Sequence, residues 1–171
     1  AVCKNGGNGV FVEEDIAEYS ELKLLCDNIS QGTDELLIHG LSGAQKAYVA
    51  AAILKKTRRP ALYLTTHLQQ AETVAEDLRA FLPTASIAIY PPAEVLPYEY
   101  YAESPELMVQ RLKVLSALVR REKLIVVAPL VALSRRLPPR EVFIQRSFPI
   151  TPGMILDREE LIARLTQLGY E

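Results

Sequence analysis

The chain has 171 residues, enough for one domain or for one domain and part of another, and its 19 basic and 21 acidic side chains leave a net charge of −2. The apolar share of 49% is enough to bury a core, which excludes disorder along the whole chain. No run approaches the roughly 20 apolar residues of a membrane span, no secretory leader opens the chain, and the few cysteines and histidines lack metal-ligand spacing. We therefore expect a folded cytoplasmic domain without a metal ion or a membrane partner.

Positive charge is concentrated in the middle of the chain, where residues 109–146 carry 9 basic and 2 acidic side chains. Such a segment can bind nucleic acid or an acidic partner. The candidate residues are Arg111, Arg120, Arg121, Arg135 and Arg136, with Lys113, Lys123 and Arg140 near them in sequence. We favour the simpler interpretation, that these spread cations solvate helix faces and strand edges, because few aromatic residues interleave with them. We expect no tight binding of DNA by this chain.

Strands and helices alternate through the first half of the chain. Apolar residues recur at helical spacing in the first expected helix, and the second is rich in alanine, the strongest helix former. Short apolar runs between the helices predict buried strands. The expected elements are a helix at 13–28, a strand at 36–39, a turn at 40–43, a helix at 44–56, a strand at 61–66, a helix at 68–82 and a strand at 86–90.

A proline- and tyrosine-rich loop follows at 91–103. The next helix is expected to have Ser104 as its N-cap and Pro105 at its first position, and to end at Arg121. The most apolar strand is expected at 123–128, followed by a short helix or turn at 130–137. Continuous apolar strands separated by helices indicate a parallel sheet covered on both faces. The predicted fold class is therefore α/β, a three-layer domain around a parallel sheet.

The pattern changes after Pro138-Pro139. Residues 141–150 alternate like a strand with one solvated face. Asp157 with Glu160 resembles a capping box that would open a helix ending at Gly169. We divide the chain into an N-terminal extension and helix at 1–33, a main domain at 34–137, and the start of a second small α/β domain at 138–171. This organisation predicts that the chain is part of a longer protein.

The turn after the first expected strand has the layout of a phosphate-binding loop, in which glycines precede a helix with lysine in its first turn. Gln45 replaces the second required glycine, so a long side chain stands where backbone N–H groups would approach phosphate oxygens. Ala47 replaces the serine or threonine whose hydroxyl would bind Mg²⁺. The residues left to contact a phosphate are Gly40, Ser42, Gly43 and Lys46.

Two interpretations of this stretch stay open: a tight strand-to-helix turn, or a phosphate loop that has lost its function. The strand ending at Ala128-Pro129 supplies no carboxylate that could hold a metal ion or orient a water. Both interpretations predict a chain with no catalytic residue, no cofactor and no ATP hydrolysis. A helix N-terminus can still hold a stray sulfate or phosphate weakly.

Five stretches of the sequence, taken in order, resemble a single family. The first two are HGLSGAQKAYVAAAI and ALYLTTHLQQAETVAEDLRAFLP, and the most distinctive carries Glu94, Leu96-Pro97-Tyr98, Ser104-Pro105 and Arg111-Leu112. LIVVAPLVALSRRLPP and PGMILDREELIARLTQLGYE follow, so the resemblance covers residues 34–171. The family is the bacterial transcription-repair coupling factors, whose first phosphate loop is degenerate.

The resemblance implies a P-loop fold of the RecA-like, helicase-lobe type, similar to the repair protein UvrB. UvrB has an intact phosphate loop and a long aromatic hairpin after the third strand. Gln45, Ala47 and the short segment 90–103 therefore favour the coupling factor over UvrB. Tyr98, Tyr100 and Tyr101 either stack on a partner or pack the loop against the domain, and we favour packing.

For function, the resemblance implies a parent protein that uses ATP in separate motor domains, displaces stalled RNA polymerase and recruits UvrA in nucleotide excision repair. This chain would be a non-catalytic UvrB-like scaffold there, with UvrA, RNA polymerase and DNA bound through other domains. We assign no UvrA contact to residues 138–171. Two alternatives stay open: a lobe of an ATP-dependent repair helicase or UvrB-type protein, and a basic DNA-binding module.

Overall fold

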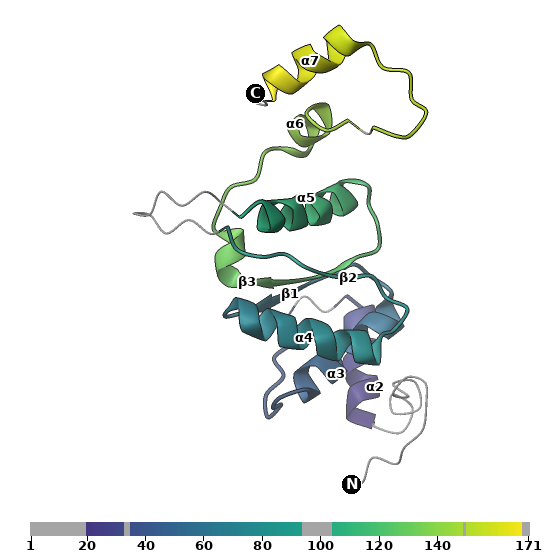
Figure 1. The fold of residues 1–171 in the computed structure, drawn as a ribbon. Coiled ribbons are helices and arrows are strands. Elements are labelled where there is room, and N and C mark those ends of the chain that lie inside the picture. The colour runs from purple at the N-terminus through teal and green to yellow at the C-terminus, as the bar shows by residue number, and fades with distance from the viewer. Residues whose placement is uncertain (1–19, 33–34, 94–103, 149, 169–171) are drawn as a thin grey trace. The chain divides into compact units, whose positions relative to one another are not determined.

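A computed structural model describes residues 20–32, 35–93, 104–148 and 150–168 of the chain, which divides into two compact units, Ala1–Arg135 and Arg136–Glu171. The domain boundaries expected near residues 34 and 138 stay a prediction. The first unit contains α2 (Ser20–Ser30), α3 (Gln45–Thr57), β1 (Ala61–Thr65), α4 (Leu68–Phe81), β2 (Ile87–Ile89), α5 (Pro105–Val119), β3 (Ile125–Pro129) and the 3₁₀ helix η1 (Leu130–Leu133) (Figure 1). The second contains α6 (Arg140–Gln145) and α7 (Arg158–Gln167).

The sheet of the first unit has three parallel strands in the order β1-β3-β2. Ala61 of β1 and Ile87 of β2 both stand opposite Ile125 of β3, so the two outer strands start level with each other. The parallel sheet predicted from the apolar runs is thus confirmed.

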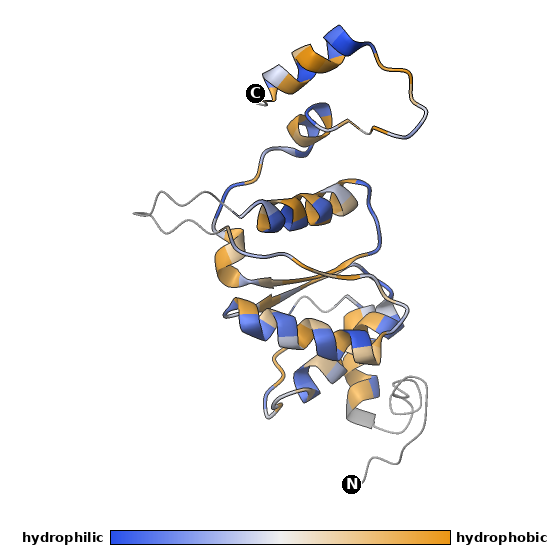
Figure 2. Cartoon of the chain, in the orientation of Figure 1, coloured by the Kyte–Doolittle hydropathy of each residue, from blue (hydrophilic) through white to orange (hydrophobic). Residues whose placement is uncertain are grey.

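Helices cover this sheet on both faces, because the side chains of β3 alternate between two cores and all five of its residues are buried. Ile125 and Val127 pack with α3 and α4, while Val126 and Ala128 pack with α5. Figure 1 shows α4 on one side of the strands and α5 on the other, and Figure 2 shows the strands in apolar colours between helices with polar outer faces. The predicted three-layer α/β architecture is confirmed.

The helix α2 packs on α3 rather than on the sheet. Leu22 is buried with Ala52 of α3, and Cys26 is fully buried nearby. Burial raises the pKa of the Cys26 thiol, an effect partly offset by Lys56. The predicted helix at 13–28 is therefore present where the structure describes it, and it extends two residues further, to Ser30.

Three other predicted helices are confirmed within a residue or two at each end, as α3, α4 and α5. Proline occupies the first position of α5, but the N-cap hydroxyl of Ser104 donates to the carboxylate of Glu106 rather than accepting from a backbone N–H. This hydrogen bond lowers the pKa of Glu106. The 3₁₀ helix η1 matches the short helix or turn expected after β3.

The strand predicted at 36–39 is wrong. Residues 35–39 have no regular secondary structure, and Leu37 is 88% exposed. A strand forms only where a neighbouring strand accepts and donates its backbone hydrogen bonds, and the described sheet pairs β1 and β2 with β3 alone. The apolar run therefore lacks a partner within the described residues.

The strand predicted at 141–150 is also wrong, because residues 140–145 form α6. Pro139 fixes the helix start, and the N–H of Phe143 donates to its carbonyl at 3.0 Å. The second unit offers no described strand as a partner, whereas a helical turn satisfies its own backbone. A short alternation of apolar residues does not by itself decide between the two.

The capping box predicted for α7 needs hydrogen bonds from two side chains, and only that of Asp157 is confirmed. Asp157 Oδ1 accepts from the backbone N–H groups of Glu159 and Glu160, at 2.9 Å each. The Glu160 carboxylate does not complete a capping box but pairs with Arg164 at 2.9 Å, one turn further on. Gly169, the expected end of this helix, lies outside the described residues, as do Glu94 and Tyr98 to Tyr101.

Candidate functional site

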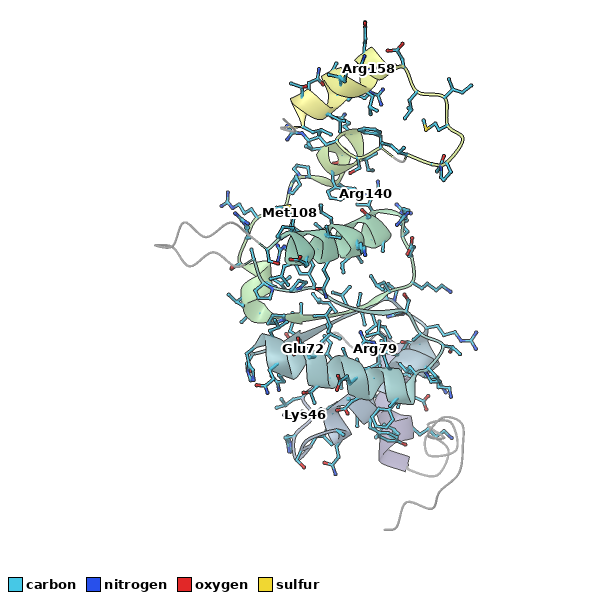
Figure 3. All side chains as sticks on the ribbon, viewed as in Figure 1. Lys46, Glu72, Arg79, Met108, Arg140 and Arg158 are labelled. Carbon is cyan, nitrogen blue, oxygen red and sulfur yellow. The ribbon has the colours of Figure 1, made fainter. Side chains whose placement is uncertain are left out.

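The stretch from Gly40 to Ala47 leads into α3 as the phosphate-loop pattern predicts, but the strand that the pattern expects before it is absent from residues 35–39. Gly40 (φ +86°) and Gly43 (φ +50°) both adopt the left-handed conformation that glycine tolerates and other residues rarely adopt. The helix then starts at Gln45, with Lys46 exposed in its first turn (Figure 3). Backbone geometry alone is therefore compatible with a loop that wraps an anion.

The side chain of Gln45 folds back over this loop. Its Oε1 accepts a hydrogen bond from the backbone N–H of Ser42 at 2.9 Å and lies 3.4 Å from the Ser42 hydroxyl. A backbone N–H in the middle of a phosphate loop is the type of donor that would bind a phosphate oxygen. Here an amide oxygen of the chain itself accepts from it.

The first N–H groups of α3 also have acceptors within the loop. The N–H of Gln45 donates to the Ser42 carbonyl at 3.1 Å, and that of Lys46 donates to the Gly43 carbonyl at 3.4 Å. The first turn of a helix normally leaves such donors for a cap, water or a ligand. These backbone N–H groups, which could otherwise bind an anion, are therefore already hydrogen-bonded within the turn.

Ala47 points into the protein rather than toward the loop. It is 1% exposed and packs in the core cluster with Ala51 of α3 and Ala71 and Ala75 of α4. A hydroxyl at this position would enter an apolar core, where an unpaired polar group and overpacking are both destabilising. In this geometry, position 47 does not face a space that could hold a metal ion.

A pocket of about 340 Å³ lies between the start of α3 and the first half of α4. Its lining includes Lys46 and Asp77, so one lysine and one carboxylate face the same space, together with other polar side chains such as those of Tyr63 and Gln70. Burial, and then Asp77, raises the pKa of the Tyr63 hydroxyl. The carboxylate makes this lining less favourable for a triphosphate than a lining of cations and N–H groups.

The ends of the strands beside this pocket carry no acid. Thr65 of β1 stands opposite Pro129 of β3, and Ala128 before it is fully buried. Within the described residues, no group of three histidine, cysteine, aspartate or glutamate side chains could hold a metal ion.

Arg111, one of the predicted nucleic-acid residues, makes its contacts inside the first unit. Its guanidinium carbon lies 4.2 Å from the centre of the Tyr90 ring, and its Nη1 donates to the carbonyl of Pro91 at 2.6 Å. The neighbouring Gln110 donates to the Ile89 carbonyl at 3.2 Å. Arg111 therefore fastens α5 to the segment that leaves β2.

The other four predicted arginines lie in two groups. Arg120 and Arg121 are exposed beyond the end of α5, where Arg120 pairs with Glu122 at 3.0 Å. Arg135 ends the first unit and Arg136 begins the second. Binding of nucleic acid by these five residues stays a prediction.

No protein-family model matches the chain. A transcription-repair-coupling factor of Bacillus subtilis (strain 168) is 36% identical to it over 156 residues, which is 91% of this chain. The chain is a homologue of the transcription-repair-coupling factors.

Staphylococcal transcription-repair-coupling factors agree with this assignment. Those of Staphylococcus haemolyticus (strain JCSC1435) and Staphylococcus aureus (strain USA300) are 28% and 27% identical over 81% and 82% of the chain. The chain spans only 12–13% of the length of these transcription-repair-coupling factors. Within the described residues, no helix has the length and apolar character needed to cross a membrane.

Tyr90 is a buried polar residue of this transcription-repair-coupling factor homologue that the sequence pattern does not single out. It is 3% exposed, and within the described residues its hydroxyl has no hydrogen-bond partner. Burial raises the pKa of this hydroxyl, while Arg111 opposes the rise. A tyrosine at the end of an apolar strand carries no sequence signal that its hydroxyl lacks a partner.

We expect Tyr90→Phe to leave the free energy of unfolding unchanged or to raise it by up to about 1 kcal/mol, because it removes an unpaired buried hydroxyl. The raised pKa also means that the wild type loses stability as the pH rises above about 10, where the unfolded tyrosine ionises first. Urea denaturation at pH 7 and at pH 10.5 would show a smaller loss in the variant. A variant that is less stable than the wild type at pH 7 would contradict this expectation.

Proposed function

We propose that this chain is a non-catalytic scaffold and interaction domain of a transcription-repair-coupling factor, acting in transcription-coupled nucleotide excision repair. The observation that carries the proposal is the hydrogen bond from the Ser42 N–H to Gln45 Oε1 at 2.9 Å. A side-chain oxygen satisfies the loop donor that a nucleotide phosphate would otherwise bind. The loop therefore does not need a ligand to satisfy this donor.

The burial of Ala47 supports the same conclusion independently. Nucleotide hydrolysis by P-loop proteins depends on a Mg²⁺ ion held in part by the hydroxyl at this position. Alanine has no ligand to offer, and its side chain belongs to the core of α3 and α4. We therefore propose that the parent protein translocates on DNA with ATP bound elsewhere, displaces stalled RNA polymerase and recruits UvrA, while this UvrB-like region holds other parts in place.

The alternative is an active lobe of an ATP-dependent repair helicase or UvrB-type protein. The parallel sheet, the left-handed glycines and Lys46 at the start of α3 favour it. Gln45, Ala47 and the absence of an acid at the end of β3 oppose it.

Calorimetric titration of the chain with ATP, in 5 mM MgCl₂ (an amount chosen to saturate the nucleotide) and in EDTA, separates these two functions. We expect no Mg²⁺-dependent binding with a Kd below about 1 mM, which corresponds to about −4.1 kcal/mol. Lys46→Ala is the matched control and should give the same trace as the wild type. Sub-millimolar binding that requires Mg²⁺ and is lost in Lys46→Ala would overturn the scaffold proposal in favour of the active lobe.

A further inference from the structure

Two short loops that are far apart in sequence lie side by side at the N-terminal end of the sheet. One joins α3 to β1 and carries Arg58 and Arg59, and the other joins α5 to β3 and carries Arg120, Arg121 and Lys123. The strands that follow them are neighbours, and the Ala61 N–H at the end of one loop donates to the Leu124 carbonyl at the end of the other at 3.4 Å. We call these five cations the basic edge.

The basic edge is exposed and carries a net positive charge. All five side chains are exposed, and the carboxylate within the two loops, Glu122, pairs with Arg120 at 3.0 Å. Lys56, in the last turn of α3 just before the first loop, lies 3.8 Å from Asp27. The positive charges that are not paired raise the local electrostatic potential, and a bound anion would lower it.

Two of the four arginines of the basic edge adopt a left-handed backbone conformation that arginine rarely adopts. Arg58 (φ +51°) ends α3, and Arg121 (φ +58°) follows the end of α5. Helices most often place glycine or asparagine at such left-handed positions. The same exception occurs in both loops of the basic edge, so both loops carry arginine where glycine would fit the backbone better.

We propose that the basic edge binds the phosphate backbone of duplex DNA without sequence preference. Four of its five cations are arginines, whose planar guanidinium groups bind phosphate oxygens in pairs. The two loops contain no aromatic side chain that could stack on a base, so the contact is to the backbone alone. The one large apolar side chain of the two loops, Leu124, is 5% exposed and offers no anchor to an acidic peptide, which favours DNA over an acidic protein. This activity goes beyond the proposed scaffold role and does not depend on it.

Fluorescence anisotropy of a labelled 20-base-pair duplex with the whole 171-residue chain tests this proposal. We expect weak binding, with a Kd of about 1–100 µM near physiological salt, and a slope of log K against log [salt] of about −4 to −5 for five phosphates. The paired substitution Arg58→Glu and Arg59→Glu should weaken binding at least tenfold and reduce the slope by about 2. The matched control, Lys23→Glu with Arg158→Glu, changes net charge equally at exposed positions outside the basic edge and should weaken binding less than threefold.

Arg58→Gly separates binding from folding. Glycine relieves the left-handed backbone, so this variant should raise the Tm by about 2 °C while it weakens DNA binding about threefold. Equal loss of binding in the control pair, unchanged binding in Arg58→Gly, or the absence of binding at low salt would each overturn the proposal. So would binding of a polyglutamate probe by a chain that does not bind the duplex, because the partner would then be an acidic protein.

Discussion

Replacing Leu78 with alanine is expected to lower the free energy of unfolding by about 2–5 kcal/mol. Leu78 is 0% exposed and is among the largest fully buried side chains of the described chain. It packs from α4 against the face of β3 that carries Ile125 and Val127. The truncation removes contacts from the layer between α4 and the sheet and leaves a cavity that the close-packed core cannot fully close. Urea denaturation followed by circular dichroism would measure the loss.

Leu112→Ala is the matched control for this experiment, because it makes the same chemical change on α5 where the side chain is 46% exposed. We expect it to cost less than about 1 kcal/mol. Equal losses in the two variants would contradict the layer arrangement, since they would mean that Leu78 is no better buried than Leu112.

The combined substitution of Gln45→Gly and Ala47→Thr restores the phosphate-loop sequence, yet we expect it to lose about 2–5 kcal/mol of stability and to gain no nucleotide binding. Glycine at the first position of α3 loses the hydrogen bond to Ser42 and weakens the helix start, which together cost about 1–2 kcal/mol. Threonine at 47 adds a larger, polar side chain to a core position, at about 1–3 kcal/mol. Thermal denaturation and calorimetry with Mg²⁺-ATP would measure the two results.

Gln45→Gly alone is the control that separates the loop from the core. It should show only the smaller loss of stability, because Ala47 remains in its alanine-lined cluster. Gain of Mg²⁺-dependent ATP binding in the double variant would mean that residue 47 faces the loop after all. It would also favour a phosphate loop that lost its function over an unrelated turn, the two interpretations that the sequence leaves open.

The parts of the fold that the sequence predicts well are those whose apolar pattern is satisfied within the chain. Residues 125–129 are apolar at every position because β3 is covered on both faces, and a fully buried strand shows no alternation. The stripe of α4 that includes Val74 and Leu78 matches the face that the sheet buries. In these elements, local pattern and tertiary packing favour the same structure.

The predictions that fail concern apolar runs whose partners are not among the described residues. Residues 36–39 have the composition of a buried strand, but without a neighbouring strand they stay exposed. Residues 141–150 alternate over too short a length to distinguish a strand from a helix, and the backbone of Pro139 starts α6 instead. The composition of such a segment predicts that its side chains pack against other apolar residues, but it does not show which segment supplies them.

The candidate site was predictable in residue type but not in geometry. The sequence identifies Gln45 and Ala47 as departures from a phosphate loop, but only the structure shows the Gln45 side chain accepting from Ser42. Arg111 looks like any other cation in sequence, whereas its contact with Tyr90 depends on how α5 crosses the end of β2. The basic edge combines residues about 60 positions apart, and sheet topology alone makes them neighbours.

The strand order β1-β3-β2 also sets when this unit can fold during synthesis. The central strand is the last of the three to be made, and neither outer strand pairs with the other. On a ribosome that adds about 5–20 residues per second, β1 waits several seconds for its first hydrogen-bonded neighbour. The non-local pairing makes folding slow compared with a helical bundle, and none of the described strands can pair until β3 has been synthesised.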